Sequence, residues 1–191
     1  MKKSYVLILA SVITLLLIFA VVIQARKEPE MDKVRPAVVA GKFYSASPAV
    51  LKAAIAGFLD DAEPATVSRP LALILPHAGY IYSGQIAADG YNQARGNGYD
   101  TVVILGTNHT SPRFSRIGLY PGDGFATPLG VSRVDRSVME TLQAACPDCV
   151  PNASVHEQEH SVEVQVPFIQ VLFPDAKIVP VVVGAPDAAL C

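Results

Sequence analysis

Three short apolar runs limit the folds open to this chain more than any other feature of the sequence. They cover Leu71–Leu75, Thr101–Leu105 and Lys177–Val183. Continuous rather than alternating hydrophobicity is typical of strands that are covered on both faces. Segments with helical periodicity separate the runs. This rhythm predicts an α/β fold with a mixed or mostly parallel central sheet flanked by helices.

Four segments have the apolar spacing of helices. They are Pro48–Ala62, Gly84–Ala94, Asp135–Ala145 and His156–Phe173. Ser47 is a suitable N-cap for the first segment, and Pro167 is expected to kink the last one. Ile117–Tyr120, with the Gly- and Pro-rich stretch after it, is expected to add a hairpin.

The N-terminus carries a longer apolar run, which predicts a membrane segment. A run of roughly 20 apolar residues is long enough to cross a bilayer as a helix. We therefore expect a signal-anchor helix at residues 1–25, a polar linker at 26–35 and an α/β domain at 36–191. This organisation predicts a membrane-anchored protein with an extracytoplasmic domain. The alternative is secretion after cleavage of a signal peptide.

Composition narrows the partners and the redox chemistry. The chain has 191 residues and a formal net charge of -2, with no basic stripe, so no nucleic-acid partner is expected. Its three cysteines are Cys146, Cys149 and Cys191. The C-x-x-C pair follows a predicted helix instead of opening one, which favours a surface disulfide or two plain thiols over a redox-active pair.

Two of the four histidines follow predicted strands directly. His77 and His109 lie just beyond the apolar runs that end at Leu75 and Leu105. Ligands of open α/β sheets bind in the crevice beyond the carboxyl ends of the strands. Two neutral imidazoles in one crevice suit Fe(II), Cu or Zn, so the pattern predicts a shared metal site. The flanking Tyr80 and Asn108 are expected to supply polar groups to the same pocket.

The segment His156–His160, HEQEH, fits the zinc-peptidase signature H-E-x-x-H. Such an enzyme needs a third metal ligand, and no histidine follows His160. Pro167 would also disrupt the helix that the motif requires. The peptidase is therefore the least favoured interpretation.

A second grouping of the same residues is preferred. On a helix, His160 and Glu163 are three residues apart, and Glu159 and Glu163 are four apart, so all three share a face. This spacing predicts His160 as an acid–base group, with Glu163 as its catalytic partner and Glu159 in the pocket. A solvated acidic helix face is the alternative.

Several blocks of sequence resemble the Memo family, whose bacterial members include the AmmeMemoRadiSam system protein B. The blocks are PHAGYIYSG (76–84), ILGTNHT (104–110), TPLG (127–130), EHSVEVQVPF (159–168) and VPVVVG (179–184). The resemblance implies a fold like that of class III extradiol dioxygenases, with a non-haem metal-type pocket. By motif, His77 and His109 match the family's two metal-type histidines. His160 matches the histidine of its Glu-His-Ser motif.

The resemblance also implies a function, and it shows where this sequence departs from the family pattern. Family members continue past the last block to an Asp/His block and a pocket Cys that completes the metal-type triad, so we expect this domain to be truncated at its C-terminus. The implied function is iron- or copper-dependent, dioxygenase-like chemistry on a small substrate, with zinc less favoured. The alternative is a module that binds a metal or a peptide without turnover. The oligomeric state is left open.

Overall fold

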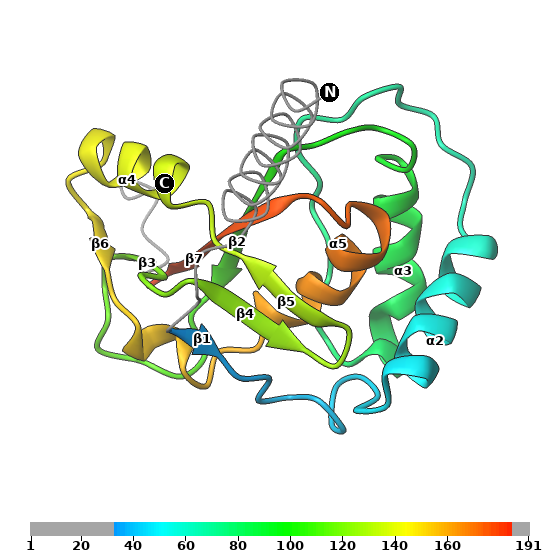
Figure 1. Ribbon diagram of the computed structural model, residues 1–191, viewed down its shortest axis with the longest axis horizontal. Coiled ribbons are helices and arrows are strands. Elements are labelled where there is room, and N and C mark those ends of the chain that lie inside the picture. Colours follow the sequence, from blue (N-terminus) through cyan, green and yellow to red (C-terminus); the bar gives the residue numbers. More distant parts are fainter. Residues whose placement is uncertain (1–32, 185–191) are drawn as a thin grey trace, which may run out of the picture. The chain divides into compact units, whose positions relative to one another are not determined.

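The computed structural model describes residues 33–184, which form two mixed β-sheets and a group of helices (Figure 1). The strands are β1 (Val34–Arg35), β2 (Thr101–Thr107), β3 (Ile117–Leu119), β4 (Gly124–Thr127), β5 (Gly130–Arg133), β6 (Cys149–Pro151) and β7 (Lys177–Val183). The helices are α2 (Pro48–Asp60), α3 (Tyr80–Asn92), α4 (Arg136–Ala145) and α5 (Val166–Leu172), with 3-10 turns η1 (Ser154–His156) and η2 (Glu163–Gln165). The predicted mixed α/β architecture is thus confirmed.

The larger sheet has the strand order β2-β7-β3-β6. β2 pairs with β7 in parallel along its whole length, from Thr101 opposite Lys177 to Thr107 opposite Val183. β3 is antiparallel to β7 and parallel to β6, which makes the sheet mixed. Five consecutive residues of β7, 178–182, are buried, because the strand is interior to the sheet and covered on both faces.

The smaller sheet has the order β1-β4-β5 and contains the only two strands that form a tight hairpin among the described residues. β4 and β5 turn at Gly130, whose φ of 125° favours glycine. The predicted hairpin therefore lies later in the chain than Ile117–Tyr120. Residues 117–119 instead form β3 of the larger sheet.

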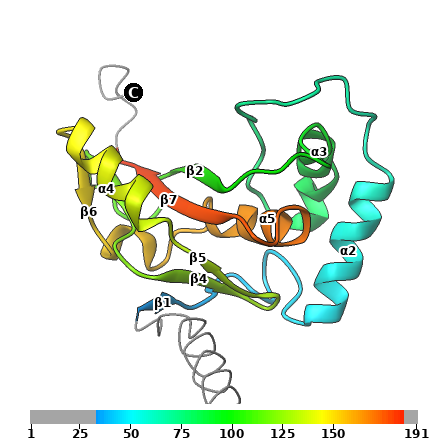
Figure 2. The same cartoon turned by 45° about the horizontal axis from the view of Figure 1, so that its top comes forward.

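Helices α2 and α3 lie side by side at one end of the described domain (Figure 2). Gly84 of α3 makes this approach close, because a Cβ there would lie 2.6 Å from the ring of Phe58 on α2. α5 packs on α3 through Phe168, whose ring stacks on that of Tyr91 with centroids 5.0 Å apart.

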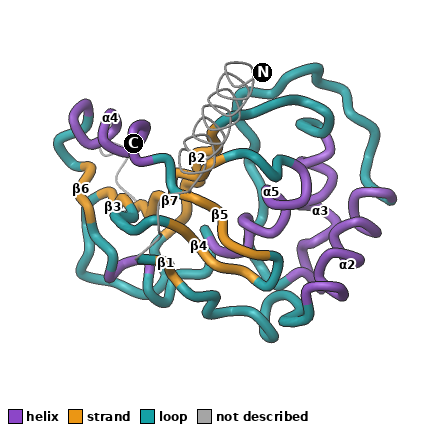
Figure 3. The backbone as a smooth tube through the Cα atoms, in the orientation of Figure 1, coloured by secondary structure: helices purple, strands orange, loops and turns teal. Residues whose placement is uncertain are grey.

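The strand predicted at Leu71–Leu75 does not form. The whole connection between α2 and α3 is loop (Figure 3). Leu71 and Ile74 are 98% and 102% exposed, although both are strongly apolar. A strand exists only with a hydrogen-bonding partner, and within the described residues this segment has none.

The prediction of one continuous helix over His156–Phe173 is also wrong. The segment divides into η1, a bend, η2 and α5. Pro167 lies in the first turn of α5, where a missing N–H costs little, so it begins a helix instead of kinking one. The apolar residues Val162, Val166 and Ile169 are buried, as predicted.

The described residues contradict the predicted membrane-anchored localisation. No helix within residues 33–184 is both long enough and apolar enough to cross a bilayer. The longest of them, α2 and α3, have 13 residues each, whereas a span needs about 20. The apolar run at residues 1–25 and most of the predicted linker lie outside the described residues.

Cys146 and Cys149 form a disulfide between the end of α4 and the start of β6, with their Cα atoms 5.2 Å apart. This agrees with the first of the two alternatives favoured for the C-x-x-C segment. Cys191 lies outside the described residues.

Candidate metal centre

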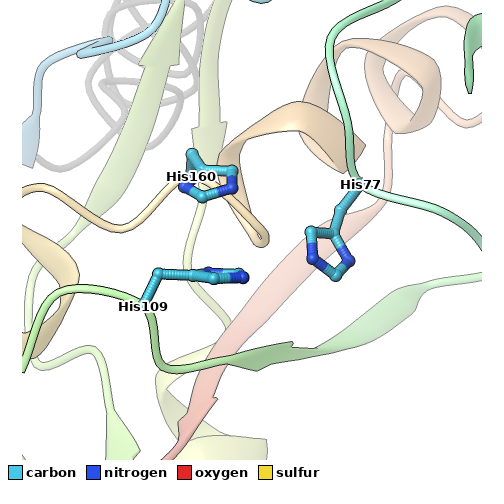
Figure 4. A group of neighbouring side chains, drawn as sticks. All are labelled: His77, His109 and His160. Atoms are coloured by element: carbon cyan, nitrogen blue, oxygen red, sulfur yellow. The ribbon is translucent and has the colours of Figure 1, made fainter. Parts of the chain in front are cut away.

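Three imidazoles from three separate segments meet in one place (Figure 4). His77 lies in the loop before α3, His109 follows β2, and His160 precedes η2. One ring nitrogen of each lies within 4.8 Å of the others. The structure thus brings together the two histidines with a predicted metal role and adds His160, for which a catalytic role was predicted.

The close approach of His160 to His109 depends on Gly106 in β2. A Cβ at Gly106 would lie 2.5 Å from Ser161 Oγ and 2.5 Å from a methyl group of Val162. The Ser161 hydroxyl donates to the carbonyl of Thr107 at 3.0 Å. The segment that carries His160 can therefore lie directly on the end of β2, and the two rings are stacked with centroids 4.3 Å apart.

Glu159 fixes His109. Its Oε1 lies 2.9 Å from His109 Nδ1, and its Oε2 accepts the backbone N–H of His109 at 2.7 Å. An ionised carboxylate only accepts hydrogen bonds, so Nδ1 carries the proton and Nε2 keeps a free lone pair. Glu159 was predicted as a pocket residue beside His160. The Nδ1 atom of His160 lies 3.6 Å from Glu159 Oε1, which is too far for a good hydrogen bond.

The charge states of these groups follow from their surroundings. Burial raises the pKa of Glu159, but hydrogen bonds from Ser161 and His109 outweigh it and lower the pKa to about 2. Burial lowers the pKa of His77, and the nearby His109 lowers it further. Burial also lowers the pKa of His160, against the opposing charge of Glu159. Neutral imidazole is the form that binds metals, so these shifts favour a metal site.

Glu163 is fully buried and forms no hydrogen bond or ion pair with any of the three imidazoles. Its carboxylate accepts hydrogen bonds from Arg35 Nη1 and from the Tyr44 hydroxyl, both at 2.6 Å. It also accepts the backbone N–H groups of Val38 and Val39. The helical face that was expected to join Glu163 to His160 does not exist, because η2 begins only at Glu163.

Besides Glu159, the two other predicted pocket residues, Tyr80 and Asn108, form hydrogen bonds that hold the chain around the site. The Tyr80 hydroxyl is buried and donates to the Val164 carbonyl at 2.8 Å. The Asn108 side chain accepts the backbone N–H of Ser111 and donates to its carbonyl, which holds the turn after β2. Phe43, which sequence reasoning did not select, lies against His160 with ring centroids 4.8 Å apart. Its only sequence signal was its place in the segment KFYSAS (42–47), which resembles an aromatic motif near the start of Memo-family proteins.

His156 is not part of the group. Its side chain is buried, and its Nε2 lies 3.1 Å from the carbonyl oxygen of Gly118. Nδ1 has no hydrogen-bond partner within the described part of the chain. HEQEH therefore does not build the helical two-histidine site of a zinc peptidase.

The donor set fits a transition metal. Three neutral imidazoles are a ligand set used for zinc, and imidazole also suits copper and iron. Glu159 does not belong to this group of ligand atoms, and its oxygens instead accept hydrogen bonds from His109, His160 and Ser161. The site therefore offers three nitrogen ligands, and the donors alone do not select the metal.

Comparison with known proteins gives a consistent result. The family model for Memo, described as Memo-like protein, matches residues 35–190. A MEMO1 family protein of Metallosphaera sedula is 38% identical over 162 residues, which cover 79% of this chain and 56% of the relative. A MEMO1 family protein of Pyrococcus furiosus is 38% identical, over 81% of this chain and 54% of the relative. A MEMO1 family protein of Saccharolobus solfataricus is 39% identical, over 76% of this chain and 55% of the relative. The chain spans about half the length of these curated relatives.

Proposed function

The chain belongs to the Memo family, and we propose on this premise that it binds one Fe(II) or Cu ion through His77, His109 and His160. The observation that supports the proposal is the convergence of their ring nitrogens within 4.8 Å. Here His160 acts as a metal ligand instead of the predicted acid–base group. Zinc is the less favoured ion, because the proposed chemistry requires a redox-active metal.

The proposed activity is dioxygenase-like oxidation of a small organic substrate, in a fold like that of class III extradiol dioxygenases. A bound Fe(II) or Cu ion would supply the redox chemistry. The residues of the chain prepare the site: Glu159 holds His109 with Nε2 free, and Phe43 covers part of the His160 ring. Glu163 acts from a distance, as an anchor of the segment that carries His160.

A second candidate is metal binding without turnover. Its support is that both nearby carboxylates, Glu159 and Glu163, are engaged in hydrogen bonds. Within the described residues, neither is free to act as a general base. Recognition of a peptide remains a prediction from the sequence.

Metal titration tests the site itself. Anaerobic titration with Fe(II), and separate titrations with Cu and Zn, should show one site per chain. We expect His77→Ala, His109→Ala and His160→Ala each to weaken binding by more than the roughly 10- to 100-fold loss typical of removing an outer-shell partner. Tyr82→Ala is the control, since Tyr82 lies on α3 nearby and is 83% exposed. Unchanged stoichiometry and affinity in all three histidine variants would refute the site.

Oxygen uptake separates the two candidates. Iron-loaded protein would be assayed in an oxygen electrode against a panel of catechols, with His109→Ala as the blank. Consumption that depends on substrate and is absent from the blank supports the enzyme. One bound metal per chain with no consumption across the panel supports metal binding without turnover.

A further inference from the structure

His77 differs from the other two histidines of the proposed metal site in how its ring is held. Glu159 hydrogen-bonds to the ring of His109 and to the backbone N–H of His160, and these two rings are stacked. Within the described part of the chain, no hydrogen bond reaches the His77 ring, whose centroid lies 5.2 Å from that of His109. The direction of the His77 ring therefore depends on the backbone that carries it.

The backbone that leads to His77 has a single polar anchor among the described residues. Residues 71–77 lie in the loop between α2 and α3 and form one hydrogen bond, from Gln165 Nε2 to the Pro76 carbonyl at 2.9 Å. This carbonyl belongs to the peptide unit that joins Pro76 to His77. Because a peptide unit is planar, a bond to its oxygen fixes the plane from which His77 departs.

Gln165 is itself held in one orientation. It is 9% exposed, and its Oε1 accepts a hydrogen bond from the Tyr91 hydroxyl at 3.0 Å. A backbone carbonyl can only accept, so the amide must turn its N–H group toward Pro76 and its oxygen toward Tyr91. The Tyr91 ring in turn stacks on Phe168 in the core. A continuous set of contacts therefore runs from the core to the peptide unit before His77.

The segment 159–165 thus contacts the chain at every histidine of the group. It carries His160 itself. At its start, Glu159 accepts hydrogen bonds from the ring and the backbone N–H of His109. At its end, Gln165 holds the peptide unit before the third histidine. One short stretch of sequence therefore supplies one ligand and orients the other two.

We propose that Gln165 is a positioning residue of the metal centre, which acts through the Pro76 carbonyl to aim the His77 ring at the metal. This inference rests on the proposed function, since it concerns the same site. The neighbouring Leu75 packs on Gly90 of α3, where an added Cβ would overlap its side chain. That contact holds the loop close to α3, but apolar contact is not directional and does not orient the peptide unit.

Cu(II) titration of the full chain tests the proposal. Gln165→Met keeps an unbranched side chain of similar length but cannot donate to Pro76, so the affinity for Cu(II) should fall roughly 10- to 100-fold, as for other partners that orient a ligand. Gln165→Asn, whose amide is too short to reach the carbonyl, should show the same loss. It replaces Gln165→Met if urea denaturation shows that the methionine variant does not fold.

Gln170→Met is the matched control. Gln170 donates its amide N–H to the Gly130 carbonyl at 3.1 Å and accepts the Thr127 hydroxyl, so the same pair of hydrogen bonds is lost away from the histidines. Its Cu(II) affinity should equal that of wild type. Equal Cu(II) affinities of Gln165→Met and Gln170→Met would overturn the proposal.

A double-mutant cycle identifies the ligand through which Gln165 acts. In a His77→Ala background, Gln165→Met should cause no further loss of Cu(II) affinity. In a His160→Ala background it should cause the full loss, although His160 lies in the same segment as Gln165. Losses that add in the His77→Ala background would show that Gln165 does not act through His77 and would overturn the proposal.

An NMR measurement on the metal-free protein separates this proposal from the metal site itself. The chemical shift of the Pro76 carbonyl carbon reports on the hydrogen bond to its oxygen, and it should change in Gln165→Met but not in Gln170→Met. An unchanged Pro76 signal in Gln165→Met would overturn the proposal whatever the Cu(II) titrations show. Wild type that takes up no Cu(II) would refute the metal site and, with it, the metal role of Gln165.

Discussion

At the scale of single residues, Glu159 is the group on which the geometry of the site depends most. It is 1% exposed and accepts hydrogen bonds from His109, His160 and Ser161. These donors come from two segments, so one carboxylate fixes both the tautomer of His109 and the path of the chain around His160. Its role follows from charge as well as position, since an ionised carboxylate can satisfy several donors at once.

Glu159→Gln should therefore damage both stability and metal binding. The amide introduces N–H groups where only acceptors fit, so we expect a loss of roughly 1–3 kcal/mol in the free energy of unfolding. Metal affinity should fall roughly 10- to 100-fold because His109 loses its orienting partner. Urea denaturation and metal titration measure the two effects. Glu157→Gln, an exposed position two residues away, is the control and should match wild type.

His156 is a residue whose role is in stability. Burial lowers its pKa from the ordinary 6.5 to about 4. Above pH 6.5 the ring is neutral in both the folded and the unfolded chain. Between 6.5 and about 4, only the unfolded chain takes up the proton, so stability falls as the pH falls. The full effect corresponds to roughly 3 kcal/mol.

The pH dependence of unfolding tests this role. We expect the free energy of unfolding from urea titrations to decrease from pH 7 to pH 4, and less steeply in His156→Gln. Gln keeps an N–H group for the Gly118 carbonyl but does not titrate. His77 and His160 also have lowered pKa values and contribute in the same direction, so the variant should retain part of the slope. Parallel curves for the two proteins would contradict the prediction.

At the scale of elements, the end of β2 organises the site. Its last residues carry Gly106 and lead directly into His109, while residues 161–162 pack against the same strand end. The sequence predicted β2 and the position of His109 from local hydrophobicity. It did not predict the packing that brings His160 there, because that contact joins residues about fifty positions apart along the chain.

Gly106→Ala should move these two elements apart. The added methyl group would overlap Ser161 and Val162, and such overpacking costs roughly 1–3 kcal/mol of stability. Metal affinity should also fall, because His160 moves away from His109. Thermal denaturation and metal titration report the two effects. Gly98→Ala is the control, since no atom lies within 4 Å of its Cβ position; equal behaviour of both variants would exclude the packing argument.

At the scale of the whole described domain, Arg35 joins the first strand to the segment around the site. Its guanidinium donates to the carbonyl oxygens of His156 and Glu159 and forms a buried ion pair with Glu163 at 2.6 Å. The partners Arg35 and Glu163 are 128 positions apart in the sequence. Such a long-range clamp holds the whole segment 156–163 against β1.

Removing one member of this ion pair should strongly destabilise the fold. Arg35→Met leaves the Glu163 carboxylate buried without its counter-charge, which typically costs roughly 3–5 kcal/mol. The double variant Arg35→Met/Glu163→Gln should lose less than the sum of the two single variants. Urea denaturation of all four proteins in a double-mutant cycle measures this coupling. Additive losses would show that the two side chains act independently.

The sequence by itself determined the α/β alternation, strands β2 and β7, most of helices α2 and α4, and the nature of the possible ligands. These properties are local, since hydrophobic period, caps and proline act within a few residues. Tertiary structure alone decided that His160 lies beside His77 and His109 and that Glu159 hydrogen-bonds to His109. It also decided that Glu163 pairs with Arg35 and so holds the segment that carries His160. It also left Leu71–Leu75 without a strand. The reason is physical: pairing and burial depend on which segment lies alongside, and neighbours in space are far apart in the chain.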